Sequence, residues 1–182
     1  MIHKHYDLEM GKSLDVFDGI FPFGFVLNAY SFCKKSNFSI GWGDGGDRNF
    51  AKEDEFLHCN FIDGDLEKLG IVEHLQKIPY IVNALSGMVN TKNVLNLSFP
   101  TEANFVHTHP EKKVLLYYAN TDWADGYHGE TMFYSEDRRA VQFCSSYVPG
   151  RLIMFDGKIP HTIRPQSPIG PKYRFTLAML FD

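Results

Sequence analysis

The hydrophobic period changes from helical spacing to near-alternation about halfway along the sequence, and this change most constrains the fold. From Val94 onward apolar and polar residues tend to alternate, and Val, Ile, Tyr, Phe and Thr are frequent, as is typical of β-strands. Turn residues such as Pro149-Gly150 and Asp156-Gly157 separate the segments. Eight strands are predicted: Val94–Phe99, Phe105–His109, Val114–Asn120, Glu130–Tyr134, Ala140–Tyr147, Arg151–Phe155, His161–Arg164 and Tyr173–Phe181. Short strands at this spacing favour a sandwich or a barrel.

The first half of the chain has apolar residues at mostly helical spacing. Those from Phe25 to Cys33 recur at steps of three and four, which predicts a helix with one buried face. Two further helices are predicted over Leu66–Gln76 and Tyr80–Met88, with Pro79 between them. The Gly-rich stretch 41–46 has neither a GxGxxG pattern nor a Walker lysine and is interpreted as a loop.

The length of 182 residues predicts a single domain over 1–182, with 1–90 as mostly helical support and 91–182 as a β core. Helices followed by about eight strands give a mainly β, α+β chain. A jelly roll is its most economical form, although the periodicity fits another eight-stranded barrel equally well.

The composition excludes several classes of protein. A hydrophobic content of 44% argues against disorder, and a net charge of −4 without a Lys/Arg run gives no nucleic-acid footprint. No window of 18 apolar residues predicts a transmembrane helix, and residues 1–10 lack the apolar core of a secretory signal. The three widely spaced cysteines, Cys33, Cys59 and Cys144, fit reduced thiols and a cytoplasmic location.

Three of the eight histidines form a pattern that suits metal binding. His107 and His109 lie two apart on a predicted strand, so their side chains should project from one face, and His161 begins another strand. A surface pair on an edge strand explains the first two equally well. The other five are interpreted as solvated or structural, and His3 and His5 are placed in a mobile N-terminus; the five are His3, His5, His58, His74 and His128.

A carboxylate ligand is available two residues beyond His109. Glu111 would complete the two-His, one-carboxylate set that is typical of non-haem Fe(II) oxygenases. Pro110 should end the strand near His109, which favours Glu111 as an exposed turn residue instead.

Arg174 is the main candidate for holding an anion. Alternation along the last strand puts it on the face opposite the bulky residues that would pack against the helices. A buried guanidinium needs a partner, and a bidentate carboxylate would satisfy it. A salt bridge at the rim of the barrel is the alternative, and Arg164 and Lys172 are rivals nearer to predicted turns.

Six pieces in order resemble the Fe(II)/2-oxoglutarate-dependent dioxygenases, and in particular their prolyl-hydroxylase-like branch. The resemblance covers about half of the chain, from Val94 to Asp182. Its pieces are His107-Thr108-His109, Leu116 to Asn120 followed by Asp122-Trp123, Gly129 to Phe133 with His128 in place of a first Gly, Pro149 to Phe155, Ile159-Pro160-His161, and Tyr173 to Leu177.

The resemblance implies a double-stranded β-helix, that is, a jelly roll, with the early helices packed outside it. It implies an enzyme that binds Fe(II), 2-oxoglutarate and dioxygen and hydroxylates a C–H bond while 2-oxoglutarate is decarboxylated to succinate. Arg174 would pair with the far carboxylate of 2-oxoglutarate, and Tyr118 would donate to the same carboxylate. The primary substrate is unknown, with a peptidyl proline as a guess at the level of the family.

The chain departs from this family at the second metal ligand. With His107 as the first ligand, His109 stands where the family has a carboxylate; with His109 first, Glu111 restores the carboxylate but shortens the link to Tyr118. We favour His107, His109 and His161. Two other functions are considered. One is a cupin-like metal protein that binds a metal through three histidines but does not use 2-oxoglutarate, and the other is a binding module whose histidines are structural.

Overall fold

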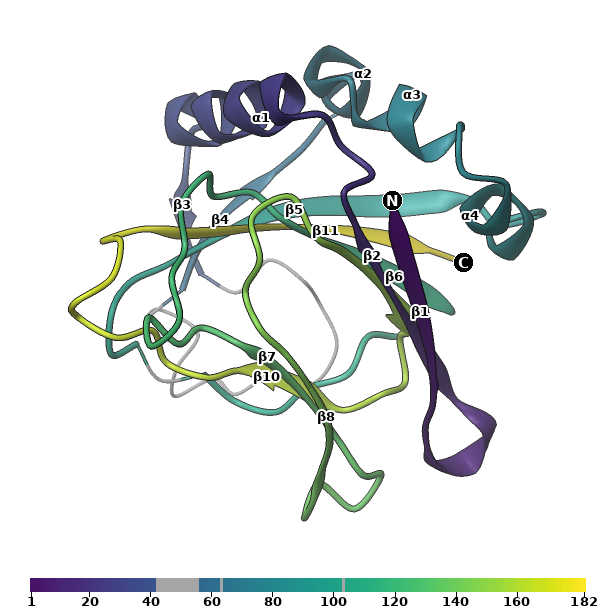
Figure 1. Ribbon diagram of the computed structural model, residues 1–182. Coiled ribbons are helices and arrows are strands. Elements are labelled where there is room, and N and C mark those ends of the chain that lie inside the picture. The colour runs from purple at the N-terminus through teal and green to yellow at the C-terminus, as the bar shows by residue number, and fades with distance from the viewer. Residues whose placement is uncertain (42–55, 63, 103) are drawn as a thin grey trace.

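The computed structural model describes residues 1–41, 56–62, 64–102 and 104–182. Within these ranges eight strands form one large sheet and three form a second, smaller sheet. Helices lie on one side of the large sheet and the small sheet lies on the other (Figure 1). The mainly β jelly-roll architecture predicted from the sequence is confirmed.

The large sheet is antiparallel throughout and mixes both halves of the chain. Its order is β1-β2-β9-β6-β11-β5-β4-β3. The strands span β1 Ile2–Asp7, β2 Ser13–Asp18, β3 Ser39–Ile40, β4 Leu57–Asn60, β5 Asn90–Ser98, β6 Lys113–Tyr118, β9 Leu152–Asp156 and β11 Arg174–Phe181. The small sheet has the order β10-β7-β8, with β7 Thr131–Tyr134, β8 Val141–Ser145 and β10 His161–Ile163.

Strands in the first 60 residues correct the expectation that 1–90 is mostly helical support. The β1–β2 hairpin forms one edge of the large sheet, and β3 and β4 form the other. The hairpin is hard to detect because β1 carries charged and polar residues on both faces and β2 contains a buried acid, Asp15, among its apolar residues.

The predicted helices are confirmed in place but are shorter than expected after residue 60. The long one is α1 Phe23–Lys35, and α4 covers Pro79–Ala84. The single helix expected over Leu66–Gln76 is two, α2 Asp65–Leu69 and α3 Ile71–Leu75. Gly70 separates them because its left-handed backbone, at φ 80°, ends the first helix. A short 3-10 turn, η1 Glu9–Gly11, connects β1 to β2. None of these helices has the length and apolar character needed to cross a bilayer.

The alternation along β11 produces two cores, one on each face of the large sheet. Phe175, Leu177 and Met179 pack against the helices, as predicted, together with residues such as Ile81. Ala178 and Leu180 point the other way, into the core between the two sheets. The other face of the same strand therefore carries Arg174 into the interior of the barrel.

Candidate metal centre and anion site

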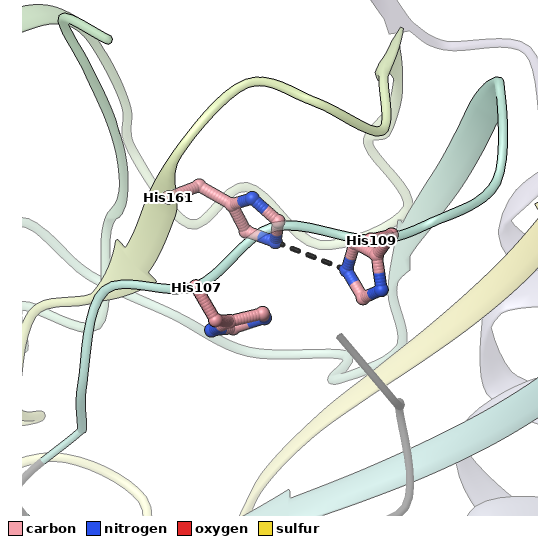
Figure 2. Close-up of side chains that lie close together, drawn as sticks. All are labelled: His107, His109 and His161. Atoms are coloured by element: carbon pink, nitrogen blue, oxygen red, sulfur yellow. Dashed lines mark hydrogen bonds between the residues drawn. The ribbon is translucent and has the colours of Figure 1, made fainter. Parts of the chain in front are cut away.

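His107, His109 and His161 come together inside the barrel, from two segments that are far apart in the sequence (Figure 2). His107 and His161 exchange both backbone hydrogen bonds, at 3.0 and 2.9 Å, and His109 N–H donates to the Gly157 carbonyl at 2.8 Å. The predicted strand Phe105–His109 is thus reduced to a single antiparallel bridge at His107. That bridge still fixes the first and last histidines beside each other.

The three imidazoles present one ligand atom each within 4.8 Å of one another. His109 Nε2 and His161 Nε2 are 3.2 Å apart. Nδ1 of His107 lies 3.2 Å from the Phe105 carbonyl, and Nδ1 of His161 lies 2.9 Å from the Ile159 carbonyl. A carbonyl only accepts, so both Nδ1 atoms carry the proton, and Nε2 of each ring is the atom with a lone pair for a metal.

Burial keeps the His107 and His161 rings in the form that a metal requires. All three histidines are buried. Burial lowers the pKa of His161 to about 4 and holds the pKa of His107 well below its ordinary value, with the neighbouring histidines adding to the effect on His107. A neutral imidazole is a ligand, whereas an imidazolium is not.

Glu111 is not part of this cluster. Among the described residues, only the three histidines have ligand atoms that converge within 4.8 Å. Glu111 lies in the bend before β6, and its backbone carbonyl packs closely against Gly157. The three-His alternative is therefore the one whose ligand atoms already lie together.

The five histidines set aside have other roles. His58 contacts the Gly41 carbonyl at 2.9 Å, and His74 packs edge-on against Phe25 at 4.8 Å. His128 forms an isolated bridge with Gln166.

The prediction that His3 and His5 lie in a mobile N-terminus is wrong. Both lie in β1 and contact Asp15 Oδ1, at 2.7 and 2.8 Å.

A cavity of about 610 Å³, including its open mouth, connects the three histidines to Arg174. Arg174 is 1% exposed, and its Nε donates to the Gly129 carbonyl at 3.0 Å. Within the part of the chain that the structure describes, its Nη1 and Nη2 have no hydrogen-bond partner, which disagrees with the alternative of a rim salt bridge. Burial lowers the pKa of Arg174, an effect that nearby Tyr147 and Tyr118 oppose.

The two rivals of Arg174 lie elsewhere. Arg164 Nη1 pairs with Glu130 Oε1 at 3.5 Å, and Lys172 Nζ lies 5.4 Å from the centre of the Tyr173 ring. Neither residue lines the cavity. Of the three basic candidates, Arg174 is thus the one that lines the cavity, and its burial is costly without further partners.

The Tyr118 hydroxyl is directed at a neighbouring hydroxyl. It donates to Thr131 Oγ1 at 2.6 Å, and both residues are fully buried. Thr131 lines the cavity, and Tyr118 contributes no lining. Because Thr131 accepts from Tyr118, its own O–H is directed elsewhere and can donate to a bound anion.

Sequence reasoning missed two residues that shape this end of the cavity. Thr131 belongs to the Gly129–Phe133 piece of the family pattern but had no assigned role. Gly129 has φ 80°, and a Cβ there would lie 3.0 Å from Trp123 and 3.2 Å from Arg174 Nε. The alternation of β7, which turns Thr131 inward, could have revealed the first; no signal in the sequence reveals the second.

The fold is similar to that of solved oxygenases. A prolyl-4-hydroxylase from Pseudomonas putida superposes with a TM-score of 0.70 at 14% identity, covering 93% of this chain and 92% of its own. A Trichoplax adhaerens prolyl hydroxylase, solved with a hypoxia-inducible factor peptide, gives 0.67 at 15% identity, covering 92% and 82%. HygX from Streptomyces hygroscopicus, solved with nickel and 2-oxoglutarate, gives 0.66 at 10% identity, covering 92% and 82%.

No family model matches the sequence, and no curated protein matches it either. At these identities the solved structures establish the fold, which is the double-stranded β-helix expected from the sequence.

Proposed function

We propose that the chain is a single-domain oxygenase, spanning residues 1–182, that uses Fe(II), 2-oxoglutarate and dioxygen to hydroxylate a C–H bond. One observation carries the proposal: a buried guanidinium, two of whose nitrogens have no hydrogen-bond partner among the described residues, lines the same cavity as three converging imidazoles. This is the donor set that a metal-chelating dicarboxylate needs, because one end meets the metal and the other needs a cationic fork.

Each residue has a defined part in this assignment. His107, His109 and His161 would hold Fe(II) through ring nitrogens, with Glu111 as the alternative ligand. Arg174 and the Thr131 hydroxyl would hold the far carboxylate of 2-oxoglutarate, and Tyr118 would act through Thr131, to which its hydroxyl donates. The bound iron and 2-oxoglutarate would supply the oxidising power: dioxygen and 2-oxoglutarate yield succinate, carbon dioxide and the hydroxylated substrate.

We propose a peptidyl proline as the primary substrate. The similarity in fold to the two prolyl hydroxylases supports this choice. We assign the enzyme to the cytoplasm, because its three cysteines are free.

The function is tested with protein purified without oxygen. We expect about one Fe(II) per chain, and succinate from 2-oxoglutarate once air is admitted. His107→Ala and His161→Ala should lose the iron while keeping the far-ultraviolet circular dichroism of the parent. Iron binding without any affinity for 2-oxoglutarate would indicate the cupin-like metal protein instead, and absence of iron would indicate the binding module.

A further inference from the structure

We infer that Tyr147 positions Arg174 for the co-substrate, through the face of its ring and through its hydroxyl group. The inference rests on the proposed function, because it takes Arg174 as the group that binds 2-oxoglutarate. Tyr147 lies just after β8, is 4% exposed, and is remote in sequence from both Arg174 and the histidines.

The rings of Tyr147 and Tyr118 lie against the Arg174 guanidinium, and we call this stacked pair the aromatic shelf. The Tyr147 ring stacks on Tyr118 with ring centres 4.4 Å apart and an angle of 6°, and its other close neighbour is Trp123 at 4.3 Å. Arg174 Cζ lies 4.9 Å from the centre of the Tyr147 ring and 5.6 Å from that of Tyr118. The shelf supports a planar cation while leaving the edge with Nη1 and Nη2 open to the cavity.

The hydroxyl of Tyr147 acts on the backbone around Arg174. Its oxygen lies 2.7 Å from the Phe175 carbonyl and 2.8 Å from Asn120 Oδ1, so its proton has an acceptor on either side. It also accepts from Asn120 N–H at 3.0 Å. The side chain of Asn120 donates through Nδ2 to the Tyr173 carbonyl at 2.7 Å and accepts from Phe175 N–H at 2.9 Å.

The contacts matter because β11 at Arg174 is paired with β5 on one side but has no strand partner on the β6 side among the described residues. Its pairing with β6 begins only at Thr176, opposite Tyr118, so Arg174 lies two residues beyond the last paired position on that side. The Asn120 amide takes the place of the missing strand by bonding the peptide groups on both sides of Arg174. The Tyr147 hydroxyl contacts both the Asn120 side-chain oxygen and the Phe175 carbonyl, and so links that amide to the backbone of β11.

The test measures 2-oxoglutarate binding to the anaerobic Fe(II) protein by its charge-transfer absorbance. Tyr147→Phe keeps the ring and removes the hydroxyl, so we expect about three- to tenfold weaker 2-oxoglutarate binding, the loss of a single hydrogen bond, with unchanged iron affinity. Tyr147→Leu removes the shelf as well and should weaken binding further. If Tyr147→Phe does not fold, Asn120→Asp, which keeps the shape but removes the Nδ2 donor, should give a similar loss.

A control variant and a double variant distinguish a specific effect of Tyr147 on Arg174 from a general loss of structure. Tyr117→Phe makes the same exchange at another buried tyrosine, which packs in the core against the helices and whose hydroxyl has no hydrogen-bond partner among the described residues, and it should leave affinity unchanged. In an Arg174→Met background, Tyr147→Phe should cause no further loss. An equal loss in both backgrounds, or no loss in the parent, overturns the role of Tyr147. A parent that binds iron but not 2-oxoglutarate overturns the proposed function, and this inference with it.

Discussion

At the residue scale, Arg174 is a buried charge with few partners. Among the described residues, the guanidinium has one hydrogen bond, from Nε to the Gly129 carbonyl, and burying a charge with so few partners costs stability. Alternation along the last strand predicts its inward direction, because its period of two is fixed by strand geometry. That Nη1 and Nη2 lack a partner among the described residues is a tertiary property that no sequence pattern encodes.

Replacing Arg174 by Met should separate co-substrate binding from metal binding. Charged hydrogen bonds are worth about 1.5–3 kcal/mol each, so 2-oxoglutarate affinity should fall by roughly one to several powers of ten. Iron affinity should be unchanged, because Arg174 is not a ligand. Arg174→Lys should also weaken binding, since an ammonium cannot form the planar fork. Anaerobic titration of the charge-transfer band measures both, and an Arg174→Met protein with parental affinity would contradict the assignment.

Glu111→Gln tests the choice between the two ligand sets. It removes a carboxylate charge with little change in shape, and Glu111 lies outside the cluster of ligand atoms. We expect iron affinity and succinate production within about twofold of the parent, whereas His109→Ala should reduce iron affinity strongly. Loss of both properties in Glu111→Gln would move the second ligand to the carboxylate.

Gly129→Ala tests the close approach between the Gly129 backbone and Arg174. A Cβ would contact Trp123 and Arg174 Nε, and alanine is strained at φ 80°. We expect a loss of about 1–3 kcal/mol in the free energy of unfolding and weaker 2-oxoglutarate binding. Gly126→Ala is the matched control, because Gly126 has φ 85° with nothing within 4 Å of the added carbon. It should cost about 1 kcal/mol and leave binding unchanged.

At the scale of elements, the sequence predicts strands well where one face is apolar and poorly where both faces are mixed. The strands from β5 to β11 were expected near their observed positions, because their successive side chains alternate between the barrel interior and the opposite face of the sheet. The β1–β2 hairpin was missed since β1 is largely exposed and its polar side chains find partners only after folding.

The hairpin should weaken as pH rises through the titration of His5. The hydrogen bond to Asp15 raises the pKa of His5, with burial opposing and Asp7 assisting, and His3 and Tyr80 also face this group. A raised pKa in the folded state means that the stabilisation is complete below the ordinary value of 6.5 and is lost above the folded value. Amide exchange in β1 should therefore speed up over that range beyond its intrinsic pH dependence.

His5→Gln should remove this extra pH dependence, because glutamine does not titrate. His58→Gln, whose imidazole contacts the Gly41 carbonyl instead, is the control and should retain it. A parent hairpin whose protection is flat across the same range would contradict the role of the His5–Asp15 contact.

At the scale of the whole molecule, the large sheet has an apolar core on each face, and the polar site lies within the inner one. The core between helices and sheet contains large aliphatic and aromatic side chains, whereas the barrel interior combines apolar side chains with three imidazoles and a guanidinium. The sequence could predict both halves of this division from patterning. It could not predict that Thr131 stands between Tyr118 and the cavity, or that Asn120 and Tyr147 replace a missing strand, because these contacts join segments through tertiary packing alone.

Ligands that bind such an interior should raise the thermal stability of the whole molecule in two separable steps. A ligand that binds only the folded state, at a concentration 100 times its Kd, stabilises that state by about 2.7 kcal/mol, which is roughly 5–10 °C in Tm for a chain of this size.

We expect Fe(II) or its redox-stable substitute Mn(II) to give one increase in Tm, and 2-oxoglutarate, added afterwards, to give a second. His161→Ala should lose both shifts, because the proposed function has the metal bind one end of the co-substrate. Arg174→Met should keep the metal shift and lose most of the second, since Arg174 lines the same cavity but is not one of the clustered ligand residues. Differential scanning calorimetry without oxygen separates these cases, and a 2-oxoglutarate shift that persists in Arg174→Met would place the far carboxylate elsewhere.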